Sequence, residues 1–192
     1  MGERLAAGNT AIALLANSIA TGAALFALIT MFAPISGAHF NPVVTMIEAV
    51  SCRLPWRHAA FYVAVQFVGA VIGVMVAHLM FELPLIQSAQ HARTGTSQWF
   101  SEVVATFGLL SVILFSSKST VPTVAATVAC YITAAYWFTA STSFANPAVS
   151  FARSLTDTFS GIRMIDAPMF MAAQVFGAVM AYVVFRWINR EL

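Results

Sequence analysis

Five long apolar segments dominate this sequence and restrict the fold that it can adopt. Each is close to the roughly 20 residues that an α-helix needs to cross the hydrocarbon core of a bilayer. Only 8% of the residues are charged and 60% are hydrophobic, which leaves too little polar surface to cover a soluble globule of this size. The sequence therefore predicts an all-α membrane protein, with a single transmembrane domain over residues 1–192. The segments cover residues 10–33, 59–81, 99–115, 122–140 and 167–187.

The charged residues and the cysteines argue against several classes of function. The net charge is +2 and Lys118 is the only lysine, so no basic run indicates a nucleic-acid partner. Cys52 and Cys130 lie in different segments without metal-ligand spacing, and we expect them to be small apolar packing residues. No His-Glu-x-x-His, no Gly-x-Ser-x-Gly and no pair of intramembrane acids indicates an enzyme. We therefore expect no enzymatic activity, no metal site and no cofactor.

The dipeptide Asn-Pro occurs twice, in Asn41-Pro42-Val43 and in Asn146-Pro147-Ala148. Asparagine is a favoured helix N-cap and proline suits the first helical position. Each dipeptide follows a long apolar segment and a short loop, and each opens a stretch too short to cross a bilayer. We interpret both as half-helices that begin inside the membrane, where matched interruptions in two halves indicate a substrate path. The alternative is that both are ordinary N-caps of short buried helices.

The chain contains an internal repeat, with one copy over roughly residues 1–90 and the other over roughly residues 97–192. Residues 64–70 (AVQFVGA) align with residues 172–178 (AAQVFGA), and their small side chains allow helices to approach closely. The second copy has two spans before its half-helix, whereas the first copy has one. The matching helix of the first copy would begin before residue 1. We therefore expect one helix of a six-helix plan to be missing from this sequence.

These motifs resemble the aquaporins and aquaglyceroporins, the major intrinsic protein family, over essentially the entire chain. Residues 36–42 (SGAHFNP) and 143–148 (SFANPA) are similar to the two pore loops of that family. Glu102, with Thr106 and Leu110 on successive helical turns, is similar to the signature of its fourth helix. The resemblance implies an inverted repeat of five transmembrane helices and two half-helices. The first helix of the family is absent, which a start codon assigned too late or a truncated gene would explain.

The resemblance also implies which residues select the solute. Water-selective members place a bulky aromatic residue, a histidine and an arginine at an outer constriction, and this chain has none of these at the matching positions. We therefore expect a wide, uncharged opening there. Arg153, one helical turn beyond the constriction, either restores positive potential at the outer mouth or is a solvated arginine at a helix end. Glu102 is expected to hold loop backbone by hydrogen bonds. The four constriction positions are Thr21, Ala134, Ser143 and Val149.

A passive channel for small neutral solutes is the predicted function. Glycerol, metalloid hydroxides such as arsenite, and water are the expected solutes, because an apolar residue such as Val149 after the second Asn-Pro-Ala is found in an arsenic-linked branch of bacterial aquaglyceroporins. The resemblance further implies a homotetramer in a bacterial inner membrane, with the first pore loop in the cytoplasm. The alternative is an inactive or structural fragment, because without one helix the pore would open towards lipid or a neighbouring subunit.

Overall fold

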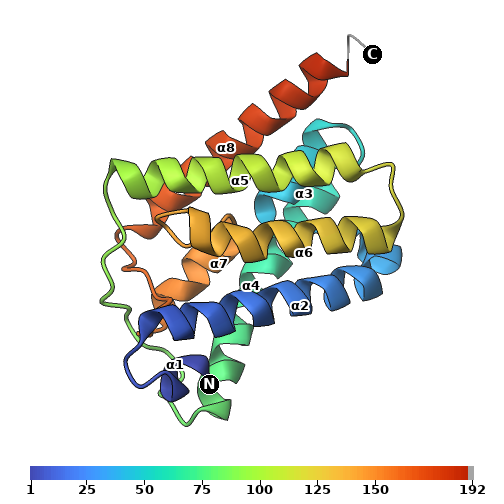
Figure 1. Cartoon of the computed structure of the whole chain (residues 1–192). Coiled ribbons are helices and arrows are strands. Elements are labelled where there is room, and N and C mark those ends of the chain that lie inside the picture. Colours follow the sequence, from blue (N-terminus) through green and yellow to red (C-terminus); the bar gives the residue numbers. More distant parts are fainter. Residues whose placement is uncertain (190–192) are drawn as a thin grey trace.

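A computed structural model describes residues 1–189, and all regular structure in that range is helical (Figure 1). Residues 190–192 of the expected domain lie outside the described residues. The prediction of an all-α membrane protein with five spans and two half-helices is confirmed. The elements are α1 (Gly2–Leu5), α2 (Thr10–Ser36), α3 (Pro42–Val50), α4 (Trp56–Met80), α5 (Thr96–Ser116), α6 (Val121–Phe138), α7 (Pro147–Ala152), the 3-10 turn η1 (Arg153–Leu155) and α8 (Ala167–Ile188).

The spanning helices are α2, α4, α5, α6 and α8, and their bounds follow the apolar segments closely. The largest differences are three residues: α4 and α5 begin three residues early, and α2 continues three residues past its expected end through Pro34. It ends at Gly37, whose φ of 76° is left-handed and whose N–H donates to the Ala33 carbonyl. Asn9 caps its other end by accepting hydrogen bonds from two backbone N–H groups.

Helix pairs α5–α8 and α2–α6 make the most extensive contacts in the structure. The α5–α8 contact requires a glycine, since a Cβ at Gly177 would lie 2.5 Å from the carbonyl oxygen of Val103. Small residues allow this close approach of two backbones inside a membrane. The position that matches Gly177 in the first repeat is Gly69 of α4, where a Cβ would have no atom of another described segment within 4 Å. The two repeats are therefore packed differently at this point.

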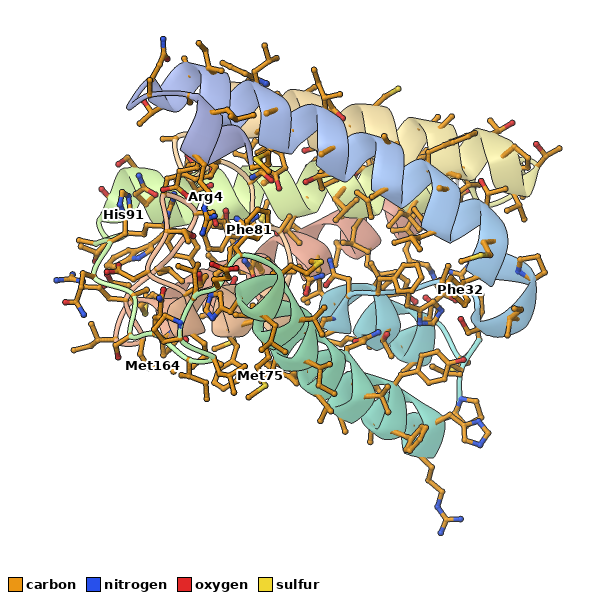
Figure 2. All side chains as sticks on the ribbon, turned by 90° about the horizontal axis from the view of Figure 1, so that it is seen from below. Arg4, Phe32, Met75, Phe81, His91 and Met164 are labelled. Atoms are coloured by element: carbon orange, nitrogen blue, oxygen red, sulfur yellow. The ribbon has the colours of Figure 1, made fainter. Side chains whose placement is uncertain are left out.

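The buried apolar core lies where α3 meets α5, α6 and α8, and it includes Ile47, Leu110 and Ile132. Large apolar side chains also cover the outward faces of the long helices (Figure 2), for example Phe61 and Val183. An apolar outer surface suits a protein whose solvent is lipid.

One end of the molecule gathers α1, the segment 81–95 and the segment 153–166. Arg4 donates to the carbonyl of Phe81 and its guanidinium lies 5.0 Å from the ring centroid of that residue, as Figure 2 shows at their labels. The backbone N–H of Phe159 donates to Glu3 over 3.0 Å. We call this the outer end, following the orientation that the sequence resemblance implies.

Candidate pore and outer constriction

Both Asn-Pro motifs begin half-helices, with the asparagine as N-cap and the proline at the first helical position. The Oδ1 atom of Asn41 accepts a hydrogen bond from the N–H of Val43 over 3.1 Å. The Oδ1 atom of Asn146 accepts from Ala148 over 3.0 Å and from Val149 over 3.3 Å. These bonds satisfy N–H groups that have no partner inside the helix. The local chemistry read from the sequence therefore sets where α3 and α7 start.

The two asparagines also bind the opposite loop. The Nδ2 atom of Asn41 donates to the carbonyl of Ala145 over 2.7 Å, and that of Asn146 donates to the carbonyl of Phe40 over 2.8 Å. Each amide thus contacts the residue that precedes the other asparagine, and the N-termini of α3 and α7 are held together. A side-chain amide has two N–H donors, so each asparagine keeps one donor that this bond does not use.

The loops before the two half-helices share an unusual backbone pattern. Residues three and one positions before each asparagine have left-handed φ angles, 49° at Ala38 and Phe40, 50° at Ser143 and 48° at Ala145. A non-glycine residue in this region costs on the order of 1–3 kcal/mol and persists only where surrounding contacts hold it. Nothing in these residue types predicts the conformation, so the sequence did not reveal it.

Glu102 of α5 supplies such contacts to the second loop. It is fully buried, and its two carboxylate oxygens accept hydrogen bonds from the N–H groups of Phe144 over 2.9 Å and Ala145 over 2.8 Å. The Nε2 atom of Gln174 donates to the same carboxylate over 2.6 Å and to Ser150 Oγ over 2.8 Å. Glu102 thus connects α5, the second loop and α8.

A matching contact holds the first half-helix. Gln66 of α4 donates through Nε2 to Thr45 Oγ1 over 2.9 Å, and Thr45 Oγ1 also lies 3.0 Å from His39 Nδ1. Thr45 and Ser150 each lie four residues after their asparagine, so both repeats tie the same position of the half-helix to a glutamine of the following helix. Sequence reasoning did not place these glutamines in the site. The available signal was their matching place in the aligned segments 64–70 and 172–178.

A cavity of about 480 Å³ runs past the junction of the half-helices. Both asparagines line it, together with three of the four expected constriction positions, Thr21, Ser143 and Val149. Arg153, expected near the outer mouth, lines it as well. Its other walls are largely apolar and include Leu25, Ile29, Val44, Leu109, Val128 and Ile132. The cavity therefore combines a few polar groups with a mostly apolar surface.

The expectation for the fourth constriction position, Ala134, differs from the structure. Its side chain is exposed on the outside of α6 and does not line the cavity. The buried face of α6 passes through Val128, Ile132 and Tyr136 at the three-to-four-residue spacing of a helix. Ala134 lies two residues from Ile132 and Tyr136, and so points away from that face. Tyr136 lines the cavity instead.

Tyr136 joins two other lining residues in a row of polar contacts. Its hydroxyl lies 3.3 Å from Thr21 Oγ1 and accepts a hydrogen bond from Arg153 Nη2 over 3.2 Å. Arg153 Nη1 and Ser143 Oγ are buried and have no hydrogen-bond partner within residues 1–189. An aromatic ring and a guanidinium therefore both line the cavity, in contrast to the uncharged opening expected from the four sequence positions.

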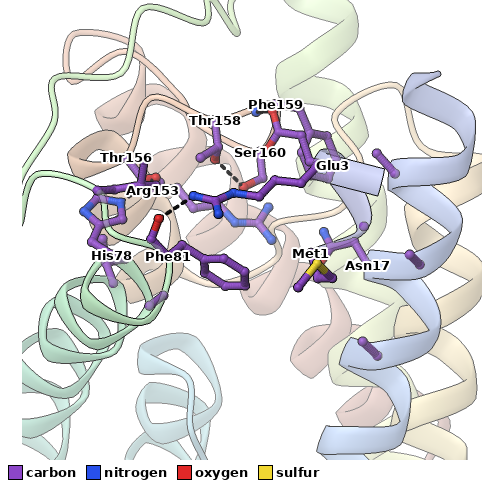
Figure 3. Close-up of a pocket in the computed structure, with 18 of the residues that line it drawn as sticks. Met1, Glu3, Asn17, His78, Phe81, Arg153, Thr156, Thr158, Phe159 and Ser160 are labelled. Atoms are coloured by element: carbon purple, nitrogen blue, oxygen red, sulfur yellow. Dashed lines mark hydrogen bonds between the residues drawn. The ribbon is translucent and has the colours of Figure 1, made fainter. Parts of the chain in front are cut away.

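A second hollow of about 860 Å³ lies beside the cavity, between α2 and α4 (Figure 3). Val149 and Arg153 line both spaces. Glu3 and His78 lie at the outer end of this hollow (Figure 3). The Nε2 atom of His78 is 2.9 Å from Thr156 Oγ1.

The titratable and thiol groups of residues 1–189 do not gather into a metal site. Within the described residues, no three His, Cys, Asp or Glu side chains are arranged to hold a metal ion. Cys52 and Cys130, expected to be small apolar packing residues, are free and exposed, so neither packs within the described part of the chain. Cys130 lies on the outward face of α6 and Cys52 in the turn after α3.

Known proteins resemble this chain over nearly all or about a third of its length. The profile of the family described as Major intrinsic protein matches residues 4–121. Aquaglyceroporin AqpS of Rhizobium meliloti (strain 1021) is 53% identical over 188 residues, which cover 98% of this chain and 80% of that protein. Aquaporin-2 of Erinaceus europaeus is 46% identical over 61 residues, covering 32% of this chain and 56% of the relative. Aquaporin NIP1-4 of Oryza sativa subsp. japonica is 42% identical over 64 residues, covering 33% and 23%.

The fold, the paired half-helices and these similarities agree with one another. Members of the matching family are channels and not enzymes. The chain belongs to the major intrinsic protein family, the aquaporins and aquaglyceroporins, and is a multi-pass membrane protein that forms a passive channel for small solutes.

Proposed function

We propose that the channel passes small neutral solutes, namely glycerol, metalloid hydroxides such as arsenite, and water. The observation that carries this proposal is the lining of the 480 Å³ cavity, where Asn41, Asn146, Ser143 and Arg153 are among the polar groups on a mostly apolar wall. A polyol has hydroxyl groups and hydrocarbon on the same molecule, and such a wall contacts both. The similarity to a bacterial protein named as an aquaglyceroporin also supports it.

Each lining group has a role in this proposal. The unused amide N–H groups of Asn41 and Asn146 donate to a solute hydroxyl oxygen and replace part of its lost hydration. Arg153 Nη1 and Ser143 Oγ, both without a partner in the described chain, offer further hydrogen bonds at the outer constriction. Val149 leaves that constriction wider than a guanidinium at the same position would.

Cations are disfavoured along the same path. The first peptide units of a helix carry roughly half a positive elementary charge at its N-terminus. The N-termini of α3 and α7 meet where Asn41 and Asn146 line the cavity, and Arg153 adds a full positive charge further out. A hydronium or alkali ion would therefore lose hydration at a site of positive potential.

The proposal places the channel in a bacterial inner membrane as a homotetramer, with the lipid bilayer in contact with the exposed apolar faces of its helices. A specific observation favours a second candidate, an inactive or structural fragment. The hollow of about 860 Å³ lies beside the cavity and shares Val149 and Arg153 with it, so the solute path has a thin wall on this side.

Stopped-flow light scattering on proteoliposomes separates the two candidates. The vesicles are first exposed to a sucrose gradient and then to a glycerol gradient, with protein-free liposomes as the control. The channel proposal predicts fast shrinkage in both cases, followed by fast re-swelling only in glycerol. A matched variant, Val149→Trp, should abolish the re-swelling by filling the constriction. Swelling no faster than in empty liposomes would favour the structural fragment.

A further inference from the structure

Arg93 lies outside every pore motif, in the segment that joins α4 to α5, yet it is almost completely buried. Only 6% of its surface is exposed, and charged residues are rarely buried to this degree unless they are paired. Within the described residues, its guanidinium forms no salt bridge with a carboxylate. Its hydrogen-bond acceptors are mostly backbone carbonyl oxygens, so the charge serves to bind loops.

The guanidinium of Arg93 joins its own segment to two others at the outer end. Its Nε donates to the carbonyl of Gly161 over 2.8 Å, its Nη1 to Ser141 over 3.0 Å and its Nη2 to Phe159 over 3.0 Å. Ser141 belongs to the loop that leads into the second half-helix, and the other two acceptors belong to the loop that follows η1. A planar fork of five N–H donors can bind acceptors in three directions, which a lysine cannot reproduce.

Arg93 also contacts the aromatic ring of Phe144, against which the guanidinium of Arg153 packs. Its Cζ atom lies 5.0 Å from the ring centroid of Phe144, and the Cζ atom of Arg153 lies 4.3 Å from the same centroid. Both distances are within the range of a cation–π interaction. Phe144 is itself buried, its ring packs against Phe170 at 5.3 Å, and its N–H is held by Glu102. Contacts with Arg93, Phe170 and Glu102 therefore hold Phe144, and Arg153 packs against the ring of Phe144.

We propose that Arg93 is a positioning residue for the pore, which holds Phe144 and thereby sets the place of the Arg153 guanidinium at the outer constriction. The largest solute that passes would then depend on a residue of the outer loop as well as on the residues that line the cavity. This inference rests on the proposed function in one respect, that the cavity lined by Arg153 is the solute path.

Arg93 and Arg153 both carry a positive charge near the ring of Phe144 and therefore repel each other, so other contacts must hold them in place. The pKa of Arg93 is lowered to about 10, mainly by burial and then by the positive charge of Arg153, while the charge of Glu102 partly opposes this shift. Arg93 therefore remains charged at neutral pH and repels Arg153. Its bonds to three carbonyls oppose this repulsion, so their loss should release both guanidinium groups.

The variant Arg93→Met tests the positioning role, because it keeps an unbranched apolar stem and removes all of the hydrogen-bond donors. The matched control is Arg4→Met, which removes an exposed arginine that also binds a carbonyl and covers a phenylalanine ring, away from Phe144. The permeability of erythritol relative to glycerol should rise several-fold in Arg93→Met and stay unchanged in the control. If the permeabilities of erythritol and glycerol changed by the same factor in Arg93→Met, Arg93 would have only a general structural role and the proposal would be overturned.

Two further measurements complete the test. The double variant Arg93→Met/Arg153→Ala should show no larger change in the erythritol-to-glycerol ratio than Arg153→Ala alone, because residues that act through one contact are not additive. Independent additive changes would contradict the proposal.

Modification of Arg153 by phenylglyoxal, followed by mass spectrometry of the protein in detergent, needs no transport. The reaction should be several-fold faster in Arg93→Met than in the wild type or Arg4→Met. An unchanged rate would overturn the positioning role, whereas an absence of glycerol transport with a faster reaction would count against the proposed function alone.

Discussion

The phenolic oxygen of Tyr136 lies 3.2 Å from the Nη2 atom of Arg153, across the outer part of the cavity. These residues belong to α6 and to η1, which directly follows the second half-helix. Their contact places an aromatic ring and a guanidinium at a constriction where the sequence positions suggested neither. The width of the opening should therefore depend on Tyr136 more than on Ala134.

Shortening Tyr136 should widen the channel. In Tyr136→Ala, we expect larger polyols such as erythritol and xylitol to become permeant, because the ring is removed and Arg153 loses an acceptor. Tyr136→Phe keeps the ring and should retain the size limit. Re-swelling rates of proteoliposomes in a series of polyols give the comparison, with Ala134→Gly as a control on the exposed side of α6. A larger effect from the Ala134 variant would contradict the assignment.

The difference between Ala134 and Tyr136 shows where sequence reasoning stops. Apolar length and Asn-Pro chemistry are local properties, so the five spans and the starts of α3 and α7 could be predicted from them. The prediction for Ala134 rests on its distance along the sequence from Asn146. A loop with left-handed residues such as Ser143 lies between the two positions. The conformation of this loop decides which face of α6 meets the pore, and it depends on contacts with Glu102 and Arg93 from distant parts of the chain.

Asn146→Ala should cost more stability than removal of an ordinary helix cap. Loss of the cap alone costs about 1 kcal/mol, and the variant also leaves the carbonyl of Phe40 without its donor, which adds on the order of 1–2 kcal/mol. Asn9→Ala removes a cap at the exposed start of α2 and is the matched control. Thermal unfolding in detergent should show a clearly larger decrease for Asn146→Ala. Equal decreases would mean that the bond between the two loops contributes little.

Glu102→Gln should destabilise the second pore loop although it changes few atoms. The buried carboxylate of Glu102 accepts three hydrogen bonds. In the variant, an amide NH₂ group replaces one of the carboxylate oxygens, so that one donor faces another donor. We expect a loss on the order of 2–3 kcal/mol of stability and slower glycerol transport. The exposed Glu82→Gln is the control, for which melting temperature and transport should both match the wild type.

The outer loops should loosen in acid through Asp166, which accepts hydrogen bonds from the side chain of Arg163 and from the N–H of Arg93. Burial tends to raise the pKa of Asp166, but these hydrogen bonds outweigh it, so the pKa lies below the ordinary value of 3.8. A depressed pKa in the folded protein means that the stabilisation is present above 3.8 and is lost as the pH falls through the lower folded value.

The melting temperature of the wild type should therefore fall more between pH 5 and pH 3 than that of Asp166→Asn, since the variant lacks the titrating carboxylate. Parallel curves for the two proteins would show that Asp166 does not carry this pH dependence.

We propose that the cavity lined by Asn41 and Asn146 passes neutral solutes and excludes ions. The most direct test measures glycerol re-swelling and proton flux, the latter with an entrapped pH-sensitive dye, on one preparation of proteoliposomes. Glycerol should enter these proteoliposomes far faster than empty liposomes, while the proton flux should equal that of empty liposomes. Proton flux that rises together with glycerol entry, or glycerol entry no faster than in empty liposomes, would contradict this proposal.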